Sequence, residues 1–213
     1  MRVGILGSGD VGQALGTGFA TLGYDVKIGS REPKSDKLEA WRSRAGGLAS
    51  TGTFAEAAAH GEMAVLATAW SGAREALDLA PLANLAGKVV IDVTNPLAPG
   101  PTGPGLALGH TDSGGEQVQR WLPDSRVVKA FNTVGNAHMF RPEFPGGPPD
   151  MFICGNDDPA KKVVGQICED FGWSVIDIGG IEGARVLEPL CILWVIYAIR
   201  NGSRDHAFRL LRK

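Results

Sequence analysis

A glycine-rich segment near the N-terminus is the first part of the sequence that could do chemistry. It fits the pattern G-x-G-x-x-G and consists of Gly7, Ser8, Gly9, Asp10, Val11 and Gly12. It follows an apolar run that predicts a strand at residues 3–6, and it opens a stretch with helical periodicity at residues 11–22. In that setting the glycines allow a tight turn and close approach of a pyrophosphate, which the helix N-terminus attracts with its free N–H groups. We therefore expect a dinucleotide site here; the alternative is a glycine-rich turn without a ligand.

The residues after the second expected strand, at 24–28, indicate which dinucleotide binds. An NAD site carries Asp or Glu about 20 residues after the glycines, where it binds the ribose 2′-OH. Ser30 and Arg31 stand there instead, and the planar arginine fork suits the oxygens of a 2′-phosphate. Lys34 would add positive charge, whereas Glu32 opposes it. The sequence favours NADP(H) over NAD(H); the alternative is a solvated arginine in a loop.

Three further segments follow expected strands and should meet at the same edge of the sheet. They contribute Thr68, Ala69 and Trp70, then Asn95 and Pro96, then Asn132 and Thr133. In an open α/β sheet, ligands bind outside the carboxyl ends of the strands. We therefore expect these residues to border the ribose and the nicotinamide, with simple packing as the equal alternative for Trp70 and Pro96.

The sequence has no evident catalytic acid, base or metal site. The four histidines show no metal-ligand spacing with one another or with cysteine: His60, His110, His138 and His206. Neither Tyr24 nor Tyr197 has a lysine four residues on, which excludes Tyr-x-x-x-Lys chemistry. We predict no catalytic residue and no metal. A nicotinamide and a flavin-like ring can exchange hydride directly, so that the protein mainly orients them and excludes water.

Two other functions stay open from the residues alone. The missing acid and base also fit a dinucleotide-binding regulatory module without turnover. Reduction of a small carbonyl or imine would instead need a proton donor, for which His138 is the candidate.

Strands and helices alternate along the sequence, which predicts βαβ units in a doubly wound, mostly parallel α/β sheet of the Rossmann type. The expected strands lie at residues 3–6, 24–28, 48–51, 63–68, 88–94, 126–131, 151–154 and 173–178. The expected helices lie at residues 11–22, 38–44, 53–60, 73–85, 116–122 and 181–200, and another opens at residues 157–159.

Two segments are expected to be irregular, at residues 96–115 and 142–149. The first contains Pro96, Pro99, Pro101 and Pro104, and six glycines between residues 100 and 115. We predict no regular structure there, and a loop of this length is usually functional or mobile.

Composition excludes several classes of protein. The chain has 213 residues, of which 30 are glycine and 44% are hydrophobic, with a net charge of −2. These values exclude a disordered chain and give no reason to expect nucleic acid as a partner. Three cysteines without C-x-x-C spacing favour a reducing cytoplasm. The longest apolar run, at residues 190–199, is shorter than the roughly 20 residues that span a membrane, so we expect a buried helix or a subunit contact.

Five segments in order resemble the NADPH-dependent F-420 reductases, the F-420H2:NADP oxidoreductases. They are Gly-Ser-Gly-Asp-Val-Gly at 7–12, Ile-Gly-Ser-Arg at 28–31, Asp-Val-Thr-Asn-Pro-Leu at 92–97, Val-Lys-Ala-Phe-Asn-Thr at 128–133 and Leu-Glu-Pro-Leu at 187–190. The cytosolic domains of the six-transmembrane metalloreductases are similar. The Gly-Ser-Gly-Asp form of the loop is nearer to the metalloreductase domains than to the Gly-Gly-Thr-Gly form of many archaeal members.

The resemblance implies a function, a site and an organisation. The cofactor would be NADP(H), and the acceptor F-420, FMN or FAD. Ser8 and the three glycines would hold the pyrophosphate, Ser30 and Arg31 the 2′-phosphate. The place where nicotinamide meets deazaflavin would be bordered by Ala69, Asn95, Asn132 and Thr133. Residues 1–131 would form the NADP-binding Rossmann domain, and residues 132–213 a small C-terminal α/β lobe that contributes to the acceptor site and to a homodimer contact.

Overall fold

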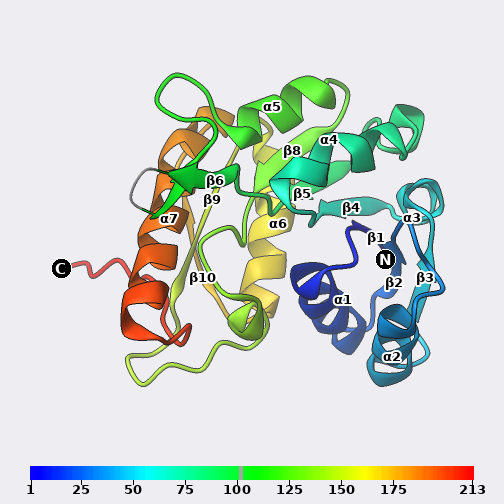
Figure 1. Ribbon diagram of the computed structural model, residues 1–213, viewed down its shortest axis with the longest axis horizontal. Coiled ribbons are helices and arrows are strands. Elements are labelled where there is room, and N and C mark those ends of the chain that lie inside the picture. The colour runs from blue at the N-terminus through cyan, green and yellow to red at the C-terminus, as the bar shows by residue number, and fades with distance from the viewer. Residues whose placement is uncertain (101–102) are drawn as a thin grey trace.

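The computed structural model describes residues 1–100 and 103–213. Within these residues, eight strands form one sheet in the order β10-β9-β8-β5-β4-β1-β2-β3 (Figure 1). Their bounds are β1 (Arg2–Leu6), β2 (Asp25–Gly29), β3 (Ala49–Gly52), β4 (Met63–Leu66), β5 (Val89–Asp92), β8 (Arg126–Lys129), β9 (Asp150–Gly155) and β10 (Ser174–Asp177). Neighbouring strands are parallel except β8 and β9, which are antiparallel. The predicted fold class, a mostly parallel Rossmann sheet, is confirmed, and β9 and β10 continue that sheet.

Helices cover both faces of the sheet. They are α1 (Asp10–Thr21), α2 (Asp36–Ala45), α3 (Phe54–His60), α4 (Trp70–Asp78), α5 (Gly114–Trp121), α6 (Asp158–Asp170) and α7 (Ala184–Asn201). One hydrophobic core joins α1, α2 and α6 to the sheet, and a second joins α3, α4, α5 and α7 to it. Successive strand residues enter opposite cores, as Val65 and Leu66 of β4 do. Burial on both faces explains why the central strands are continuous apolar runs.

The predicted helix at residues 73–85 is wrong at both ends. Helix α4 begins earlier, at Trp70, and ends at Asp78, and the short 3₁₀ helix η1 (Leu82–Asn84) follows it. Pro81 separates the two. Proline has no N–H to donate and disfavours the helical conformation in the residue before it, so the helix cannot continue.

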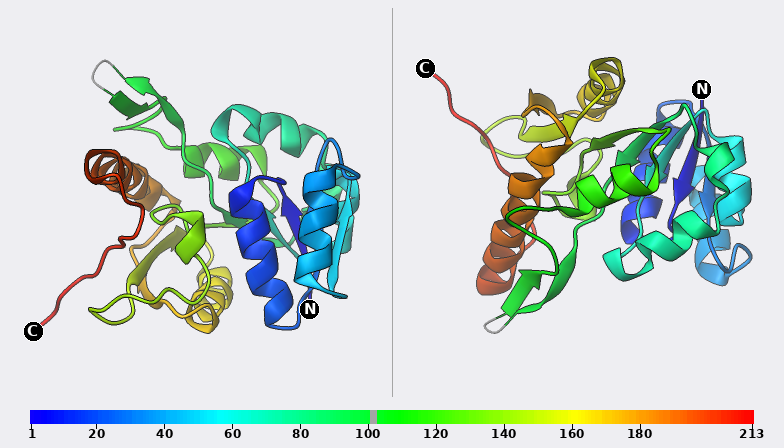
Figure 2. Two further views of the ribbon diagram at one scale, coloured as in Figure 1. Left: turned by 60° about the horizontal axis from the view of Figure 1, so that its bottom comes forward. Right: turned by 90° about the horizontal axis from the view of Figure 1, so that it is seen from above.

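The prediction that residues 96–115 hold no regular structure is also wrong. Strands β6 (Leu97–Gly100) and β7 (Gly103–Leu106) pair as an antiparallel ribbon, and α5 begins at Gly114. Figure 2 shows the ribbon projecting from the sheet near α7, which β7 contacts. Pro101, part of the same prediction, lies outside the described residues. The second irregular segment, at 142–149, has neither helix nor strand, as predicted.

The register of the ribbon explains why it tolerates proline. Ala107 N donates to Pro96 O, and hydrogen-bonded and non-hydrogen-bonded pairs alternate along an antiparallel ladder. Pro99 therefore faces Pro104 in a pair that needs no N–H group. The missing N–H groups of Pro99 and Pro104 therefore cost the ribbon no hydrogen bond.

Candidate functional site

The three loop glycines have different physical roles. A Cβ atom at Gly7 would lie 2.4 Å from Ala67 O, and one at Gly12 would lie 2.1 Å from Gly7 O. These two positions must be glycine because backbone packs against them. A Cβ at Gly9 would meet nothing within 4 Å. Gly9 faces open space, as expected of a backbone that a ligand approaches.

A first cavity of about 710 Å³ opens in front of this loop. Its lining includes Gly7, Ser8 and Gly9 of the loop, Ser30 and Arg31 after β2, and Thr68 and Ala69 after β4. Helix α1 points its N-terminus at this space, and no side chain caps its first turn. The free N–H groups and the helix dipole suit a phosphate there.

Two serines connect the glycine loop to the end of β2. Ser8 Oγ donates to Ser30 Oγ at 3.1 Å, and Gln13 Nε2 of α1 donates to Ser8 O at 2.9 Å. Arg31 lies beside them, with its guanidinium 3.5 Å from a carboxylate oxygen of Glu75 on α4. Lys34 is exposed and does not line the cavity.

A second cavity of about 500 Å³ adjoins the first. The two share Gly9, Ala67, Thr68, Ala69 and Ser71 as a common wall. The second is also lined by Asp10, Val11, Trp70, Thr94, Asn95, Leu97 and Asn136. Together the cavities run along the carboxyl ends of β2, β1, β4 and β5, where a dinucleotide is expected to lie across the sheet.

The hydroxyl group of Thr68, in the wall that the two cavities share, is evidence for a ligand site. This oxygen is buried and has no hydrogen-bond partner within the described part of the chain. Buried hydroxyl groups are normally paired. An unpaired hydroxyl beside the open Gly9 is the arrangement that a bound dinucleotide would complete, so the residues present fit NADP(H).

Asn132, Thr133 and Pro96 are not among the residues that line either cavity. Asn132 Nδ2 donates to Asn95 Oδ1 at 3.0 Å, and Asn95 Nδ2 donates back to Asn132 O at 2.9 Å. The structure thus makes Asn132 a support for Asn95, which itself lines the cavity. Thr133 and Pro96 are buried. Trp70 both lines the cavity and stacks on Trp121, with ring centroids 5.4 Å apart.

A buried ion network beneath the second cavity was not identified from the sequence. Lys129 Nζ lies 2.7 Å from Asp92 Oδ2 and 3.0 Å from Glu188 Oε1, and it donates to Thr94 O at 2.8 Å. Lys129 and Asp92 have no exposed side-chain surface. Burial lowers the pKa of the Lys129 ammonium, but the two carboxylates more than offset this and hold it above its usual value.

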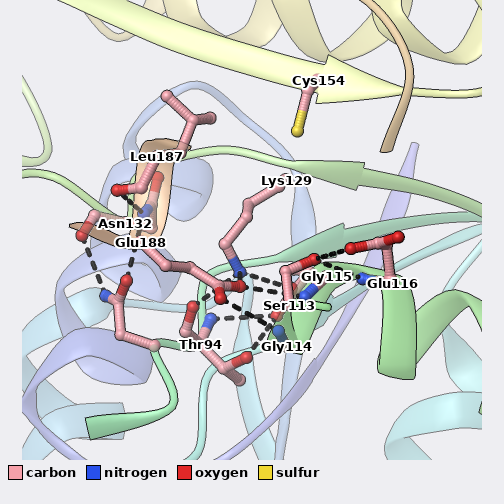
Figure 3. A network of polar contacts seen from close by, with 12 residues as sticks. Thr94, Ser113, Gly114, Gly115, Glu116, Lys129, Asn132, Cys154, Leu187 and Glu188 are labelled. Carbon is pink, nitrogen blue, oxygen red and sulfur yellow. Dashed lines mark hydrogen bonds and ion pairs between the residues drawn. The ribbon is translucent and has the colours of Figure 1, made fainter. Parts of the chain in front are cut away.

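Glu188 connects this network to α5 (Figure 3). Its two carboxylate oxygens accept hydrogen bonds from Gly114 N and Gly115 N, each at 2.9 Å. A carboxylate at a helix N-terminus is stabilised by the free N–H groups and the dipole. In the sequence, Asp92 and Lys129 each follow an apolar run, and the structure pairs these two residues in register at the ends of β5 and β8. This pattern could have pointed to the Asp92–Lys129 pair, but it gives no sign of Glu188.

Asn136 is a second residue that sequence reasoning missed. It begins the short 3₁₀ helix η2 (Asn136–His138) and lines the second cavity. His138 of the same turn does not line it, and its Nε2 lies 3.0 Å from Asp205 Oδ1. Among residues 1–100 and 103–213, no cluster of His, Cys, Asp and Glu could hold a metal ion.

Comparisons with known proteins agree with this geometry. A family model described as "NADP oxidoreductase coenzyme F420-dependent" matches residues 2–96. The chain is 30% identical to the F420-dependent NADP reductase of Methanothermobacter marburgensis, over 99% of this chain and 98% of that protein. It is 31% identical to the rat (Rattus norvegicus) metalloreductase STEAP3 over 89% of this chain, but it spans only 36% of that longer protein.

Structural comparison gives the same result. The solved structure of an Arthrobacter sp. FB24 protein, assigned as an F420-dependent NADP reductase, superposes with a TM-score of 0.93 at 35% identity and covers the whole of both chains. The family resemblance predicted from five sequence segments is confirmed, as is its relation to the metalloreductases. The chain belongs to the family of coenzyme F420-dependent NADP oxidoreductases.

Proposed function

We propose that this chain transfers hydride between NADP(H) and a deazaflavin of the F-420 type, with FMN or FAD as the alternative acceptor. The observation that carries the proposal is the wall shared by two adjoining cavities. The first cavity offers groups for phosphates, and the second adjoins it at the carboxyl ends of β4 and β5, where the nicotinamide and the acceptor ring would meet. The names of the relatives support F-420 as the acceptor.

In this proposal, the residues that line the two cavities bind and orient the cofactor. Gly9 and the N-terminus of α1 bind the pyrophosphate, and Ser30 and Arg31 bind the 2′-phosphate. Asn95, held by Asn132, orients the nicotinamide carboxamide. Trp70 and Leu97 shield the meeting place from water. Bound NADPH supplies the hydride from its nicotinamide ring, so that orientation and exclusion of water are what remains for the protein.

The second cavity favours direct hydride exchange over reduction of a carbonyl or imine. Within the described chain, Asp10 is the only titratable residue that lines this cavity. A hydrogen bond from Lys37 at 2.8 Å lowers the pKa of the Asp10 carboxyl below its usual value. A carboxylate that is already ionised cannot donate the proton that a carbonyl or imine would need.

An acceptor screen tests the proposal. Purified protein is mixed with NADPH and, separately, with F-420, FMN, FAD and a small cyclic imine, and loss of nicotinamide absorbance is followed. We expect turnover with F-420 or a flavin and none with the imine. Tight NADPH binding without turnover on any acceptor would instead support a regulatory module.

We also propose that the chain forms a homodimer through α7. This helix exposes Val186, Leu193 and Tyr197 on its outer surface. Apolar side chains exposed at helical spacing form a stripe that a second copy can cover.

A further inference from the structure

Two exposed residues that line the first cavity, Arg31 and Glu75, form an ion pair, and the proposed function gives Glu75 no role. Arg31 Nη1 lies 3.5 Å from Glu75 Oε2, and both side chains are largely solvent-exposed, at 71% and 56%. Arg31 follows β2, whereas Glu75 lies in the second turn of α4. Both residues line the first cavity. The pair therefore bridges the place where a 2′-phosphate would bind.

The acidic residues that line the first cavity weaken the attraction of Arg31 for a phosphate. The charged residues that line the first cavity, within the part of the chain described, are Arg31, Glu32 and Glu75. One positive and two negative charges leave a net charge of −1. A phosphate monoester brings up to two further negative charges near neutral pH. The phosphate must compete with Glu75 for the guanidinium of Arg31, and the negative charge of Glu75 also repels the phosphate.

We propose that Glu75 is a specificity-determining residue that holds Arg31 in the free protein and limits the preference for NADP(H) over NAD(H). Exposed ion pairs are weak, so a 2′-phosphate can displace Glu75 from Arg31. A nucleotide without that phosphate leaves the pair intact. The inference rests on the proposed binding of NADP(H) in the first cavity, but not on the identity of the acceptor.

The neighbouring turn of α4 offers a matched control. Asp78 lies three residues after Glu75 on the same helix, and Arg74 Nε pairs with its Oδ1 at 2.9 Å. The Arg74–Asp78 pair is comparably exposed, but neither residue lines the first cavity. Glu75→Gln and Asp78→Asn each remove one negative charge and one exposed ion pair from α4. Only the first acts on Arg31.

Calorimetric titration with adenosine 2′,5′-bisphosphate and with 5′-AMP measures the effect without any turnover. We expect Glu75→Gln to bind the bisphosphate about threefold to tenfold more tightly, since a nearby like charge is removed, and to bind 5′-AMP within about twofold of wild type. Asp78→Asn should change neither affinity by more than about twofold, and added salt should shrink the gain in Glu75→Gln.

Opposite outcomes are easy to recognise. If Glu75→Gln binds the bisphosphate more weakly than wild type, Glu75 orients Arg31 for the phosphate; if the affinity is unchanged, Glu75 plays no part. Either result overturns this proposal and leaves the proposed binding of NADP(H) intact. An equal gain in Asp78→Asn would reduce the effect to general charge on α4 and would also overturn it. If wild-type protein binds neither nucleotide, this inference and the proposed function fail together.

Discussion

Lys129 carries its charge on a fully buried side chain, which requires both carboxylates beside it. The side chains of Lys129 and Asp92 are fully buried, and Glu188 is nearly so. Removing one partner from such a group leaves an uncompensated buried charge, which is strongly destabilising. The role of the network is to fix Thr94, and with it the wall of the second cavity, since Lys129 also donates to Thr94 O.

Replacement of Lys129 by methionine should therefore lower the free energy of unfolding by about 3–5 kcal/mol. The exposed Lys37, paired with Asp10, is the control, and Lys37→Met should cost less than about 1 kcal/mol. Urea unfolding measures both. Because the pKa of Lys129 is raised on folding, its contribution should persist at every pH below its unfolded pKa of about 10.4 and be lost only as pH rises through the folded pKa. Equal costs for the two substitutions would contradict the assignment.

The glycine loop gives a second prediction at the scale of single residues. Gly9 has an extended backbone (φ −70°, ψ −177°) and free space around a Cβ, so Gly9→Val should lower the melting temperature much less than Gly12→Ala does. The added methyl groups enter the ligand's space and should weaken NADPH binding roughly tenfold to a hundredfold. Gly12→Ala places a Cβ against Gly7 O and should lower stability itself. A stable Gly9→Val that binds NADPH normally would show that no phosphate approaches Gly9.

Among the elements, α5 and α7 depend on each other. Glu188 of α7 receives the first N–H groups of α5, and Arg185 Nε of α7 donates to Glu116 Oε2 of α5 at 2.8 Å. These contacts join the C-terminal helix to the segment that follows the β6–β7 ribbon. Helices α5 and α7 are thus connected through side chains, although more than 60 residues separate them along the chain.

Acid should loosen this connection through Glu116. The hydrogen bond from Arg185 lowers the pKa of the Glu116 carboxyl below its usual value, against the opposing effect of burial. A carboxyl whose pKa falls on folding contributes stability above its unfolded pKa of about 4.3, and this is lost as pH falls through the folded pKa. The unfolding free energy of wild type should fall over that range more steeply than that of Glu116→Gln. Parallel pH profiles for the two proteins would contradict the connection.

How far the elements were predictable depends on how local their causes are. The strands β1, β4 and β5 were recognised because burial on both faces makes their sequences apolar. The β6–β7 ribbon was missed because proline and glycine disfavour strands locally, whereas its stability comes from a register that no local pattern reveals. Asn132 was expected on the cavity wall because it follows a strand; its place behind Asn95 depends on the packing of α7, whose Leu187 O accepts from Asn132 Nδ2. The ion network of Lys129 was missed because one of its two carboxylates, Glu188, lies far along the chain.

At the scale of the whole molecule, the sheet forms one continuous scaffold for the site. Strands β9 and β10 extend it on one side, and α7 lies beside the β6–β7 ribbon (Figure 2). The outer side of α7 carries the exposed apolar stripe assigned above to a second copy.

Leu193→Glu tests that assignment. A carboxylate in an apolar interface pays a desolvation cost, so the variant should be monomeric by light scattering where wild type is dimeric. Val163, exposed at 40% on α6, is the control, and Val163→Glu should leave the dimer intact. A monomeric wild-type protein, or a dimer that survives Leu193→Glu, would rule out α7 as the contact.

Isotope transfer tests direct hydride exchange between NADPH and the deazaflavin. Protein is incubated with F-420 and NADPH deuterated at nicotinamide C4, each stereoisomer in turn, and the reduced deazaflavin is examined by mass spectrometry. Direct transfer in a dry, oriented site predicts that one stereoisomer delivers its deuterium to the deazaflavin carbon without loss to solvent. Reduced deazaflavin without deuterium from either stereoisomer would contradict direct transfer. Protein that binds NADPH but reduces neither F-420 nor a flavin would contradict the proposed function itself.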